Sequence, residues 1–424
     1  MSVVAKFKKR FYFVAARYFK FFADRSLKRW APRIIAVTGS VGKTTMLHLI
    51  EKELGSRAHY SHDANSAFGV AFDLVGLKGI KGSKSRWLYL IFAVPIKSLF
   101  YHHTEEFYIV EIDGERPHEA EFVASWLEPE VSLWISFGLS HAVQFEKQVE
   151  AGTFPDLKTA IAHEFATIPR HTVRQVYIDG DIPEMVESTK GLEAKVTKCY
   201  KSELEKYTVY PDHSDFTVNG QTFHFATPQP KDLVIQLVML EKLCKFLKVK
   251  LITDFSDLPL PPGRSSFFEG VNGLKIIDSS YNAHLISMES ILEMAKSLRA
   301  PHKWLVIGDI VDQGSIESEE HKKLAAAIAN VKPDQVVLVG HRTNKYTLPI
   351  LKKKKIKAVS FLEPTDALEY IKKHTKGNET LIFKGSQYLE WIIEKLLKNP
   401  EDINLLPRRE KAAIARRKKR GLDS

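Results

Sequence analysis

Thr38-Gly39-Ser40-Val41-Gly42-Lys43-Thr44-Thr45 is the stretch that decides the fold, because it stands between a predicted strand and a predicted helix. The predicted strand Arg33–Val37 precedes it, and Leu47, Ile50 and Leu54 share one face of the segment that follows. Glycines let backbone N–H groups close around phosphate oxygens, and a helix N-terminus adds partial positive charge. The lysine reaches the outer phosphates and the threonine hydroxyl can ligate Mg2+. The agreement of strand, loop and helix predicts a nucleotide phosphate loop rather than a chance glycine-rich turn. Its expected binding residues are Gly39, Ser40, Val41, Gly42, Lys43, Thr44 and Thr45.

Short apolar runs alternate with helical patterns along most of the chain, which predicts α/β domains with largely parallel sheets. The runs are Ile34–Val37, Tyr108–Ile112, Val131–Phe137, Val173–Ile178, Trp304–Ile307, Val336–Val339 and Leu381–Phe383. Between the two groups, Phe216–Phe223 is typical of a hairpin that turns at Asn219-Gly220. Residues 258–263 are rich in proline and glycine, so we expect a linker and a domain boundary near residue 262.

The bulk composition is that of a globular chain of two or three domains, with 424 residues, 44% hydrophobic and 27% charged. Cys199 and Cys244 form neither a disulfide framework nor a zinc-ligand spacing, which fits a reducing compartment. The net charge of +11 lies mostly at the two ends. Residues 408–424 hold eight Lys or Arg, and such a terminal run is typical of a solvated tail. We therefore rank nucleic acid last among the partners.

Residues 5–30 predict a basic amphipathic helix, because five apolar side chains recur at spacings of four and three among many Lys and Arg. They are Phe7, Phe11, Val14, Tyr18 and Phe21. Two interpretations stay open: the helix docks on its own protein, or it lies in an anionic membrane surface. The apolar run Trp87–Ile96 is too short to span a membrane and contains Pro95, so we expect a buried strand or helix segment. Without a secretory signal, we expect a cytoplasmic protein, either free or peripheral at the inner face of the membrane.

The short loop form Thr-Gly-Ser-x-Gly-Lys-Thr resembles the phosphate loop of the Mur ligases, and further motifs follow in the family's order over about residues 31–400. The Tyr-Asn-Ala and Lys-Gly-Ser pieces favour the MurF branch. The motifs are Asp63–Val70, Val110–Gly114, Phe137–His141, Pro262–Arg264, Asp278–Ala283, Gly308–Gly314 and Lys384–Ser386.

This resemblance implies a P-loop central domain with a mostly parallel sheet and a Rossmann-like C-terminal domain. The expected division is a basic helix over 1–30, a central ATP-binding domain over 31–262, a C-terminal domain over 263–400 and a basic tail over 401–424. The implied activity is an ATP- and Mg2+-dependent amide ligase of peptidoglycan precursor synthesis that acts through an acyl phosphate. Its partners would be a muramoyl-peptide acceptor and an amino acid or dipeptide, with D-alanyl-D-alanine favoured.

The resemblance also implies roles for individual residues. Thr44, Glu111 and His141 would ligate Mg2+, and Asp278 and Asn282 would lie near the nucleotide. The expected catalytic residues are Lys43, Glu111, His141, Arg264 and Lys384. Each has a plainer alternative as a surface carboxylate, a structural histidine or a surface cation.

The sequence departs from the family pattern at several places. Only the basic helix precedes the phosphate loop, where a MurF ligase has a domain for the uridine end of its substrate. Ser279 and Gln387 replace an Asp and an Arg. The family's carbamylated lysine should fall in the helical stretch Leu157–Ile168, near Phe165, yet the only lysine there is Lys158. Two outcomes stay open: Glu164 takes the carbamate's place as a metal ligand, or the second metal site is lost and catalysis is weak.

Two other functional classes are compatible with the sequence. One is a catalytically weak or non-catalytic, membrane-associated ATP-binding homologue, and the other is a nucleic-acid-associated ATPase. Turnover that depends on a peptide acceptor separates the ligase from the first. Strongly salt-dependent binding of RNA or DNA would identify the second.

Overall fold

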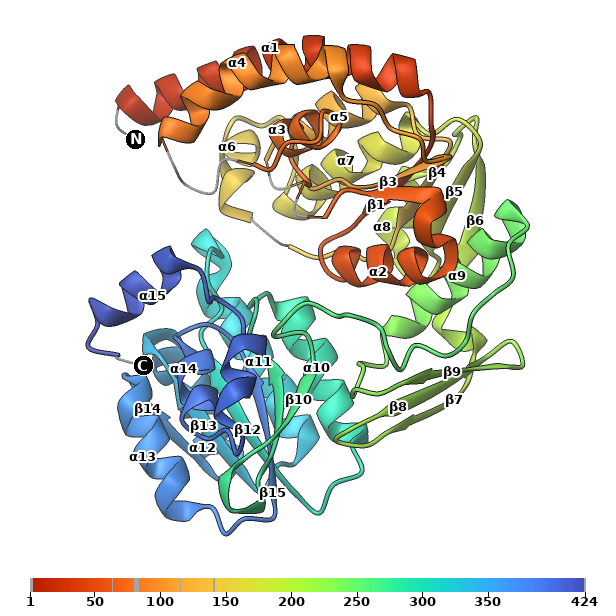
Figure 1. The fold of residues 1–424 in the computed structure, drawn as a ribbon. Helices are drawn as coiled ribbons and strands as arrows, with labels where there is room; N and C mark the ends of the chain where they lie inside the picture. The colour runs from red at the N-terminus through yellow and green to blue at the C-terminus, as the bar shows by residue number, and fades with distance from the viewer. Residues whose placement is uncertain (1–2, 63, 80–83, 115, 140–141, 423–424) are drawn as a thin grey trace. The chain divides into compact units, whose positions relative to one another are not determined.

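The computed structural model describes residues 3–62, 64–79, 84–114, 116–139 and 142–422, with the backbone alone for 3–11, 84 and 85. By its internal contacts the chain forms two compact units (Figure 1). Unit 1 comprises Met1–Phe137, Gln144–Tyr200 and Met239–Leu251, and unit 2 comprises Gly138–Val143, Lys201–Val238 and Ile252–Ser424. The single boundary near residue 262 stays a prediction.

Unit 1 is built on a six-stranded sheet in the order β2-β3-β1-β4-β5-β6, in which every neighbouring pair is parallel. The three central strands are buried along almost their whole length, as expected of parallel strands covered on both faces. The strands are β1 (Arg33–Thr38), β2 (Ala58–Tyr60), β3 (Phe107–Glu111), β4 (Val131–Trp134), β5 (Gln175–Asp179) and β6 (Lys195–Cys199).

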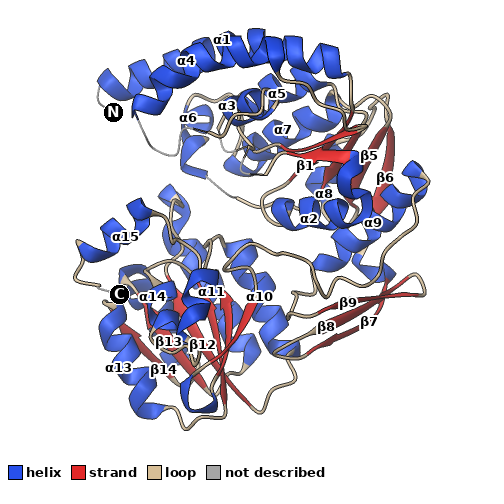
Figure 2. Ribbon diagram, in the orientation of Figure 1, coloured by secondary structure: helices blue, strands red, loops and turns tan. Residues whose placement is uncertain are grey.

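Helices surround this sheet in unit 1 (Figure 2). They are α2 (Lys43–Leu54), α3 (Ala67–Asp73), α5 (Glu119–Leu127), α6 (Glu146–Glu150), α7 (Leu157–Arg170), α8 (Pro183–Ser188) and the second half of α9 (Leu233–Leu247). Two longer helices, α1 (Val3–Trp30) and α4 (Lys84–Phe100), run side by side along one edge of the unit (Figure 1).

The N-terminal helix α1 has two different apolar faces. Ala16, Phe19, Ala23 and Leu27 are buried in the core of unit 1, where the Phe19 ring lies 4.9 Å from that of Phe72 in α3. Those four positions hold the helix on its own protein. The apolar positions that the sequence pattern identified lie on a different face. Val14, Tyr18 and Phe21 are exposed, and the side chains of Phe7 and Phe11 lie outside the described residues.

The run Trp87–Ile96 forms part of helix α4, but the expectation that it is buried is wrong. Leu90 and Val94 are buried, whereas Leu88, Tyr89 and Phe92 are exposed. One stripe of the helix is covered by the core of unit 1, and the stripe on the other side has no cover among the described residues.

Unit 2 contains a second six-stranded sheet in the order β10-β11-β15-β12-β13-β14, with β10 antiparallel and the other pairs parallel. Its strands are β10 (Ser266–Glu269), β11 (Lys275–Ser279), β12 (His302–Gly308), β13 (Gln335–Val339), β14 (Ala358–Phe361) and β15 (Glu379–Lys384). Its helices are α10 (Leu285–Ser297), α11 (Glu317–Val331), α12 (Leu348–Lys353), α13 (Pro364–His374), α14 (Leu389–Glu394) and α15 (Lys411–Lys418). The α/β class with largely parallel sheets is confirmed in both units.

A small antiparallel sheet of β7 (Leu204–Val209), β8 (Ser214–Val218) and β9 (Gln221–Phe225) also belongs to unit 2. The predicted hairpin is its β8–β9 pair. Asn219 and Gly220 form the two-residue turn with φ of 48° and 77°, and positive φ at both positions is what this turn requires.

The basic C-terminal segment is not the solvated tail that its charge suggested. Leu406 and Leu422 are buried in the core of unit 2. Arg409 and Arg417 each donate to Glu394 at 2.8 Å, and Arg417 is itself buried. The arginines compensate the charge of a buried carboxylate, and this requirement holds the segment on the protein.

Candidate active site residues in the two units

The phosphate loop joins β1 to α2 in the predicted order. Gly42 precedes α2 with φ of +86°, in the left-handed region that favours glycine. A Cβ on Gly39 would lie 2.9 Å from the backbone nitrogen of Ser136, which follows β4. Ser136 Oγ accepts from the Val41 N–H at 2.9 Å and donates to the Val41 carbonyl at 2.7 Å. Ser136 therefore fixes the shape of the loop from a neighbouring strand, and sequence reasoning did not identify it.

Lys43 lies in the first turn of α2 and its ammonium group has two close oxygen contacts. Nζ donates to the Gly39 carbonyl at 2.7 Å and is 2.7 Å from Asp113 Oδ1, with the two paired side chains only 10% and 12% exposed. The other Asp113 oxygen accepts from Asn65 Nδ2 at 2.7 Å. From the sequence alone, no role was assigned to Asp113. Its position two residues after Glu111 nevertheless places a second carboxylate beside the loop.

Thr44 and Glu111 bring two oxygen ligands together at the carboxyl ends of the strands. Thr44 Oγ1 donates to Glu111 Oε2 at 3.1 Å, and the Glu111 N–H donates to Ser61 Oγ at 2.8 Å. A hydroxyl beside a carboxylate is a donor set that suits Mg2+. These two residues therefore fit the metal expected with ATP. His141, the third predicted ligand, lies outside the described residues.

Glu164 on α7 is buried with both carboxylate oxygens at backbone donors. Oε2 accepts from the His118 N–H and Oε1 from the Ala120 N–H, both at 2.8 Å, at the start of α5. Burial raises the pKa of this carboxyl to about 7. Phe165 is buried, while Lys158 is exposed and paired with Glu184 at 2.5 Å. The contacts give Glu164 a helix-capping role, and metal ligation by Glu164 stays a prediction.

In unit 2, predicted residues gather where β11 and β15 end. Lys384 is buried and donates to Asn282 Oδ1 at 2.9 Å. Burial lowers the pKa of Lys384 to about 7, and the Arg264 guanidinium adds to this effect. Asp278 Oδ1 accepts from the Ser280 N–H at 2.8 Å, and burial raises the pKa of Asp278 to about 6. Arg264 lies over the Tyr281 ring, 4.9 Å from its centroid.

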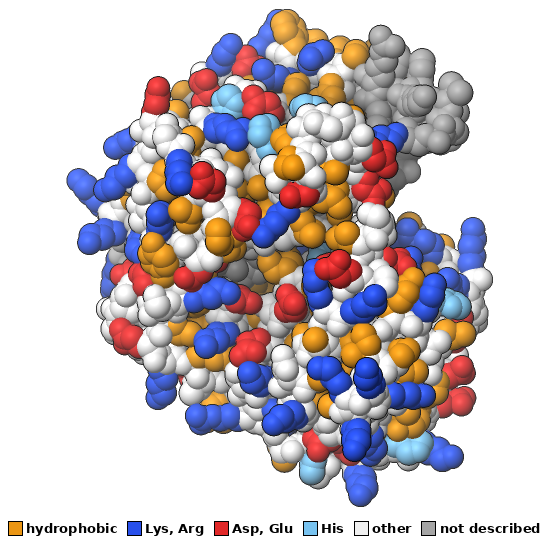
Figure 3. Space-filling model, turned by 180° about the vertical axis from the view of Figure 1, so that it is seen from behind, with side chains coloured by type: hydrophobic (Ala, Val, Ile, Leu, Met, Phe, Trp, Pro, Cys, Tyr) orange, Lys and Arg blue, Asp and Glu red, His pale blue; other side chains and the backbone are white. Residues whose placement is uncertain are grey.

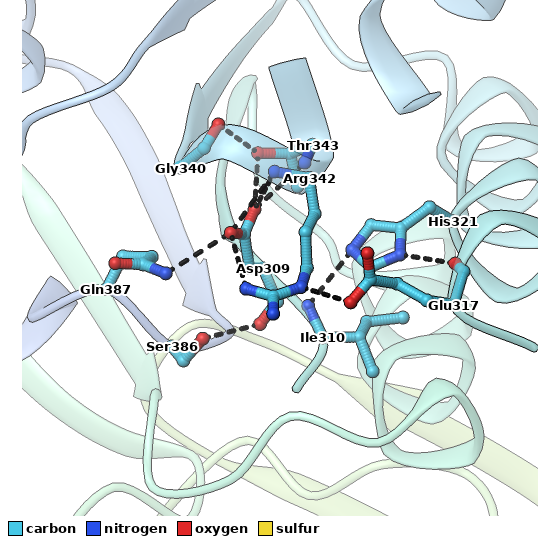
Figure 4. Close-up of polar contacts among 9 residues, drawn as sticks. All are labelled: Asp309, Ile310, Glu317, His321, Gly340, Arg342, Thr343, Ser386 and Gln387. Carbon is cyan, nitrogen blue, oxygen red and sulfur yellow. Dashed lines mark hydrogen bonds and ion pairs between the residues drawn. The ribbon is translucent and has the colours of Figure 1, made fainter. Parts of the chain in front are cut away.

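Asp309 is the centre of a polar network at the ends of β12, β13 and β15 (Figure 4). Its buried carboxylate accepts from the Thr343 N–H at 2.9 Å and from Gln387 Nε2 at 3.2 Å, and its carbonyl accepts from Ser386 Oγ at 2.7 Å. Gln387, one of the departures from the family pattern, therefore has a defined partner. A Cβ on Gly308 would lie 1.9 Å from the Ser386 carbonyl, so glycine is required where these strand ends meet.

Beside this network, the neighbouring polar side chains are also fixed. His321 Nε2 accepts from the Ile310 N–H at 3.2 Å, and its Nδ1 faces the Glu317 carbonyl at 2.8 Å (Figure 4). Arg342 Nε lies 2.5 Å from a Glu317 carboxylate oxygen. The contacts of Asp309 with Thr343, Ser386 and Gln387 connect the ends of β12, β13 and β15, so the network holds these strand ends in position.

Comparison with known proteins gives similarities of sequence and of fold. Residues 263–387 match the family model described as Mur ligase, glutamate ligase domain. The chain is 23% identical over 389 residues to the UDP-N-acetylmuramoyl-tripeptide–D-alanyl-D-alanine ligase of Bacillus subtilis, covering 89% of this chain and 79% of the relative.

Solved structures with a similar fold over 90% of this chain include two MurF ligases. One is the MurF ligase of Thermotoga maritima in complex with ADP, with a TM-score of 0.68, 16% identity and 83% of that chain covered. The other is MurF of Acinetobacter baumannii, with a TM-score of 0.69, 19% identity and 80% covered.

Proposed function

We propose that this chain, a homologue of the Mur ligases with MurF among its relatives, is an ATP-dependent ligase that forms an amide bond on a peptidoglycan precursor. The observation that carries the proposal is the phosphate loop, with Lys43 and Thr44 beside the carboxylates of Asp113 and Glu111. A nucleotide-binding loop with an adjacent Mg2+ donor set is what transfer of the γ-phosphoryl group requires.

The reaction begins with transfer of the γ-phosphoryl group of ATP to a carboxylate of the acceptor. The loop N–H groups and Lys43 would hold the phosphates, and Thr44 and Glu111 would hold Mg2+, whose charge would stabilise the negative charge that develops during transfer. The amine nitrogen then bonds to the acyl carbon, the bond from that carbon to the phosphate oxygen breaks, and the amine loses a proton. Phosphate and ADP leave with the amide product.

The family resemblance suggests roles for three residues of unit 2. Asn282 would bind the nucleotide, and Arg264 and Lys384 would bind carboxylate or phosphate oxygens. With its pKa near 7, Lys384 can release a proton at neutral pH more readily than an exposed lysine. An anionic group beside Lys384 would instead favour its charged form.

The proposed acceptor is a muramoyl peptide and the proposed amine is D-alanyl-D-alanine. Support comes from the Bacillus subtilis relative, whose name states these substrates, and from the Tyr281-Asn282-Ala283 and Lys384-Gly385-Ser386 motifs. The test below uses acceptors both with and without UDP.

A catalytically weak homologue is the second candidate, and two hydrogen bonds of Glu164 favour it. Both carboxylate oxygens of Glu164 already accept backbone hydrogen bonds. These hydrogen bonds compete with the metal ligation that Glu164 would need in order to replace the carbamate. Loss of the second metal site would leave nucleotide binding intact and slow the chemical step.

The test is release of phosphate from ATP with muramoyl-tripeptide acceptors, with and without UDP, in the presence of D-alanyl-D-alanine or single amino acids. We expect release that requires both acceptor and amine and that disappears in Lys43→Ala. Binding of ADP without acceptor-dependent turnover would favour the weak or non-catalytic homologue. Absence of ADP binding would refute both.

A further inference from the structure

Exposed apolar side chains gather on α1 and α4 of unit 1. Among the described residues, sixteen large hydrophobic side chains are exposed, and ten of them belong to these two helices. They are Val14, Tyr18, Phe21, Leu88, Tyr89, Ile91, Phe92, Ile96, Leu99 and Phe100. Phe92 and Phe100 are 64% and 72% exposed. Single exposed apolar residues are ordinary, but a concentration of this kind marks an interaction surface.

The two helices hold this surface in a fixed arrangement. Pro95 lacks the N–H that would bond to the Ile91 carbonyl one turn earlier, and the Tyr18 hydroxyl donates to that carbonyl instead, at 2.8 Å. Further along, Arg29 Nη2 donates to the Ser98 and Tyr101 carbonyls at 3.0 and 2.7 Å. The exposed side chains are therefore presented by a packed pair of helices.

The charge around these side chains is of one sign. Within α1 there are nine Lys or Arg, and within α4 there are three. Asp24 is the only acidic residue of the two helices, and it is already paired with Lys28 at 2.7 Å. Arg17, Arg25 and Lys97 are exposed beside the apolar side chains. At the upper edge of Figure 3, hydrophobic and basic side chains lie next to one another.

This combination identifies the chemistry of the partner. Aromatic and aliphatic side chains flanked by Lys and Arg are the signature of helices that lie in the plane of an anionic bilayer surface. No described helix combines the length and apolar content needed to cross a bilayer. A second copy of this chain is a poorer fit, because it would bring two basic faces together.

We propose that α1 and α4 form one membrane-docking surface that binds the headgroup region of an anionic lipid bilayer, with α4 supplying most of the inserted side chains. The inference goes beyond the proposed ligase function and does not depend on it. It also differs from docking by the N-terminal helix alone, since seven of the ten exposed side chains belong to α4.

The test is co-sedimentation of the full chain with vesicles of phosphatidylcholine alone or mixed with phosphatidylglycerol. We expect binding to the mixed vesicles that weakens with salt. The combined substitutions Leu88→Ser, Phe92→Ser and Phe100→Ser should reduce partitioning about tenfold or more, because these side chains insert. The matched control is Val173→Ser with Leu362→Ser and Leu405→Ser, which changes exposed apolar residues elsewhere and should bind like the wild type.

A second variant, Arg17→Glu with Arg25→Glu and Lys97→Glu, should lose the preference for anionic vesicles. Equal binding to neutral and anionic vesicles, or equal loss in the control and the α4 variant, would overturn the proposal. So would concentration-dependent dimerisation, lost in the α4 variant, in a chain that binds neither kind of vesicle. Phosphate release measured without vesicles reports the ligase reaction separately, so failure of one proposal is distinguishable from failure of the other.

Discussion

The buried pair between Lys43 and Asp113 leads to a quantitative prediction about nucleotide binding. In the structure the lysine faces the Gly39 carbonyl and the aspartate, whereas a bound nucleotide needs the same ammonium group at its phosphates. Nucleotide binding therefore replaces the Asp113 carboxylate by a phosphate as the anionic partner of Lys43. We predict that Asp113→Asn stabilises the nucleotide complex relative to the free protein.

The magnitude follows from the burial and the remaining partners. Removing one partner of a buried ion pair costs about 3–5 kcal/mol when the other charge is left uncompensated. Here Lys43 keeps the Gly39 carbonyl, and the single oxygen of the new amide can still accept from Lys43 although it no longer accepts from Asn65, so we expect about 1–2 kcal/mol in the free protein. If a phosphate compensates the charge of Lys43 in the complex, the stability that Asp113→Asn removes from the free protein is regained on binding, and the variant binds the nucleotide more tightly. A change of about 1.4 kcal/mol corresponds to a roughly tenfold lower Kd for ADP.

The assay is calorimetric titration with ADP in the absence of Mg2+, together with thermal unfolding. We expect the free variant to melt lower by roughly 2–5 °C and the ADP complex to recover most of the difference. Lys43→Ala and the double variant complete a cycle, in which the effect of Asp113→Asn should vanish without the lysine. If Asp113→Asn weakens ADP binding as much as Lys43→Ala does, the aspartate acts in the bound state and the exchange argument is refuted.

Three further predictions concern other buried groups. Because the pKa of Lys384 is lowered to about 7 in the folded protein, the unfolded chain binds more protons above that pH, so the free energy of unfolding rises with pH from 7 toward 10. Lys384→Met should remove a slope of at most about 1.4 kcal/mol per pH unit, measured by urea unfolding at several pH values, and an identical slope in the variant would contradict the assignment. Glu164→Gln should lower stability by about 1–2 kcal/mol, because one amide oxygen cannot accept from both the His118 and Ala120 N–H groups. A sharply raised Mg2+ requirement in the same variant, with turnover insensitive to bicarbonate, would show that Glu164 is also a metal ligand, whereas bicarbonate stimulation lost in Lys158→Ala would show a surviving carbamylated lysine. Gly308→Ala should destabilise unit 2 by about 3 kcal/mol or more, seen as lost soluble yield or a lower unfolding midpoint, because its Cβ would overlap the Ser386 carbonyl; near-native stability would show that the strand ends can separate.

The strands of the two six-stranded sheets that the sequence predicted are buried along most of their length. A continuous apolar run such as Val336–Val339 is visible without knowledge of the fold. Strands β6 and β14 were not predicted, because their side chains are mostly half-buried or exposed and their composition does not differ from that of a loop. The burial of Trp87–Ile96 was mispredicted for a related reason: apolar content does not say which side of a helix the protein covers.

Site residues were predictable where the chemistry is local in the chain. Lys43 and Thr44 stand in one loop with a known physical role, and Glu111 was placed by its motif at a strand end. Asp113 and Asp309 were not assigned because their partners lie far away in the sequence, at Lys43 and at Thr343. Only the folded sheets bring these groups within hydrogen-bond distance.

The Asp309 network also has a consequence for the kinetics of folding. Its carboxylate accepts from residues 34 and 78 positions further along the chain, so β12, β13 and β15 must already be aligned before these bonds form. Closing such long loops costs entropy that local contacts do not, which delays this step until late in the assembly of unit 2. Interactions absent from the folding transition state act mainly on the unfolding rate. Substituting Asp309 should therefore accelerate unfolding of the native protein while leaving its refolding rate nearly unchanged, and the backbone amide of Thr343 should exchange with solvent only when the whole unit opens.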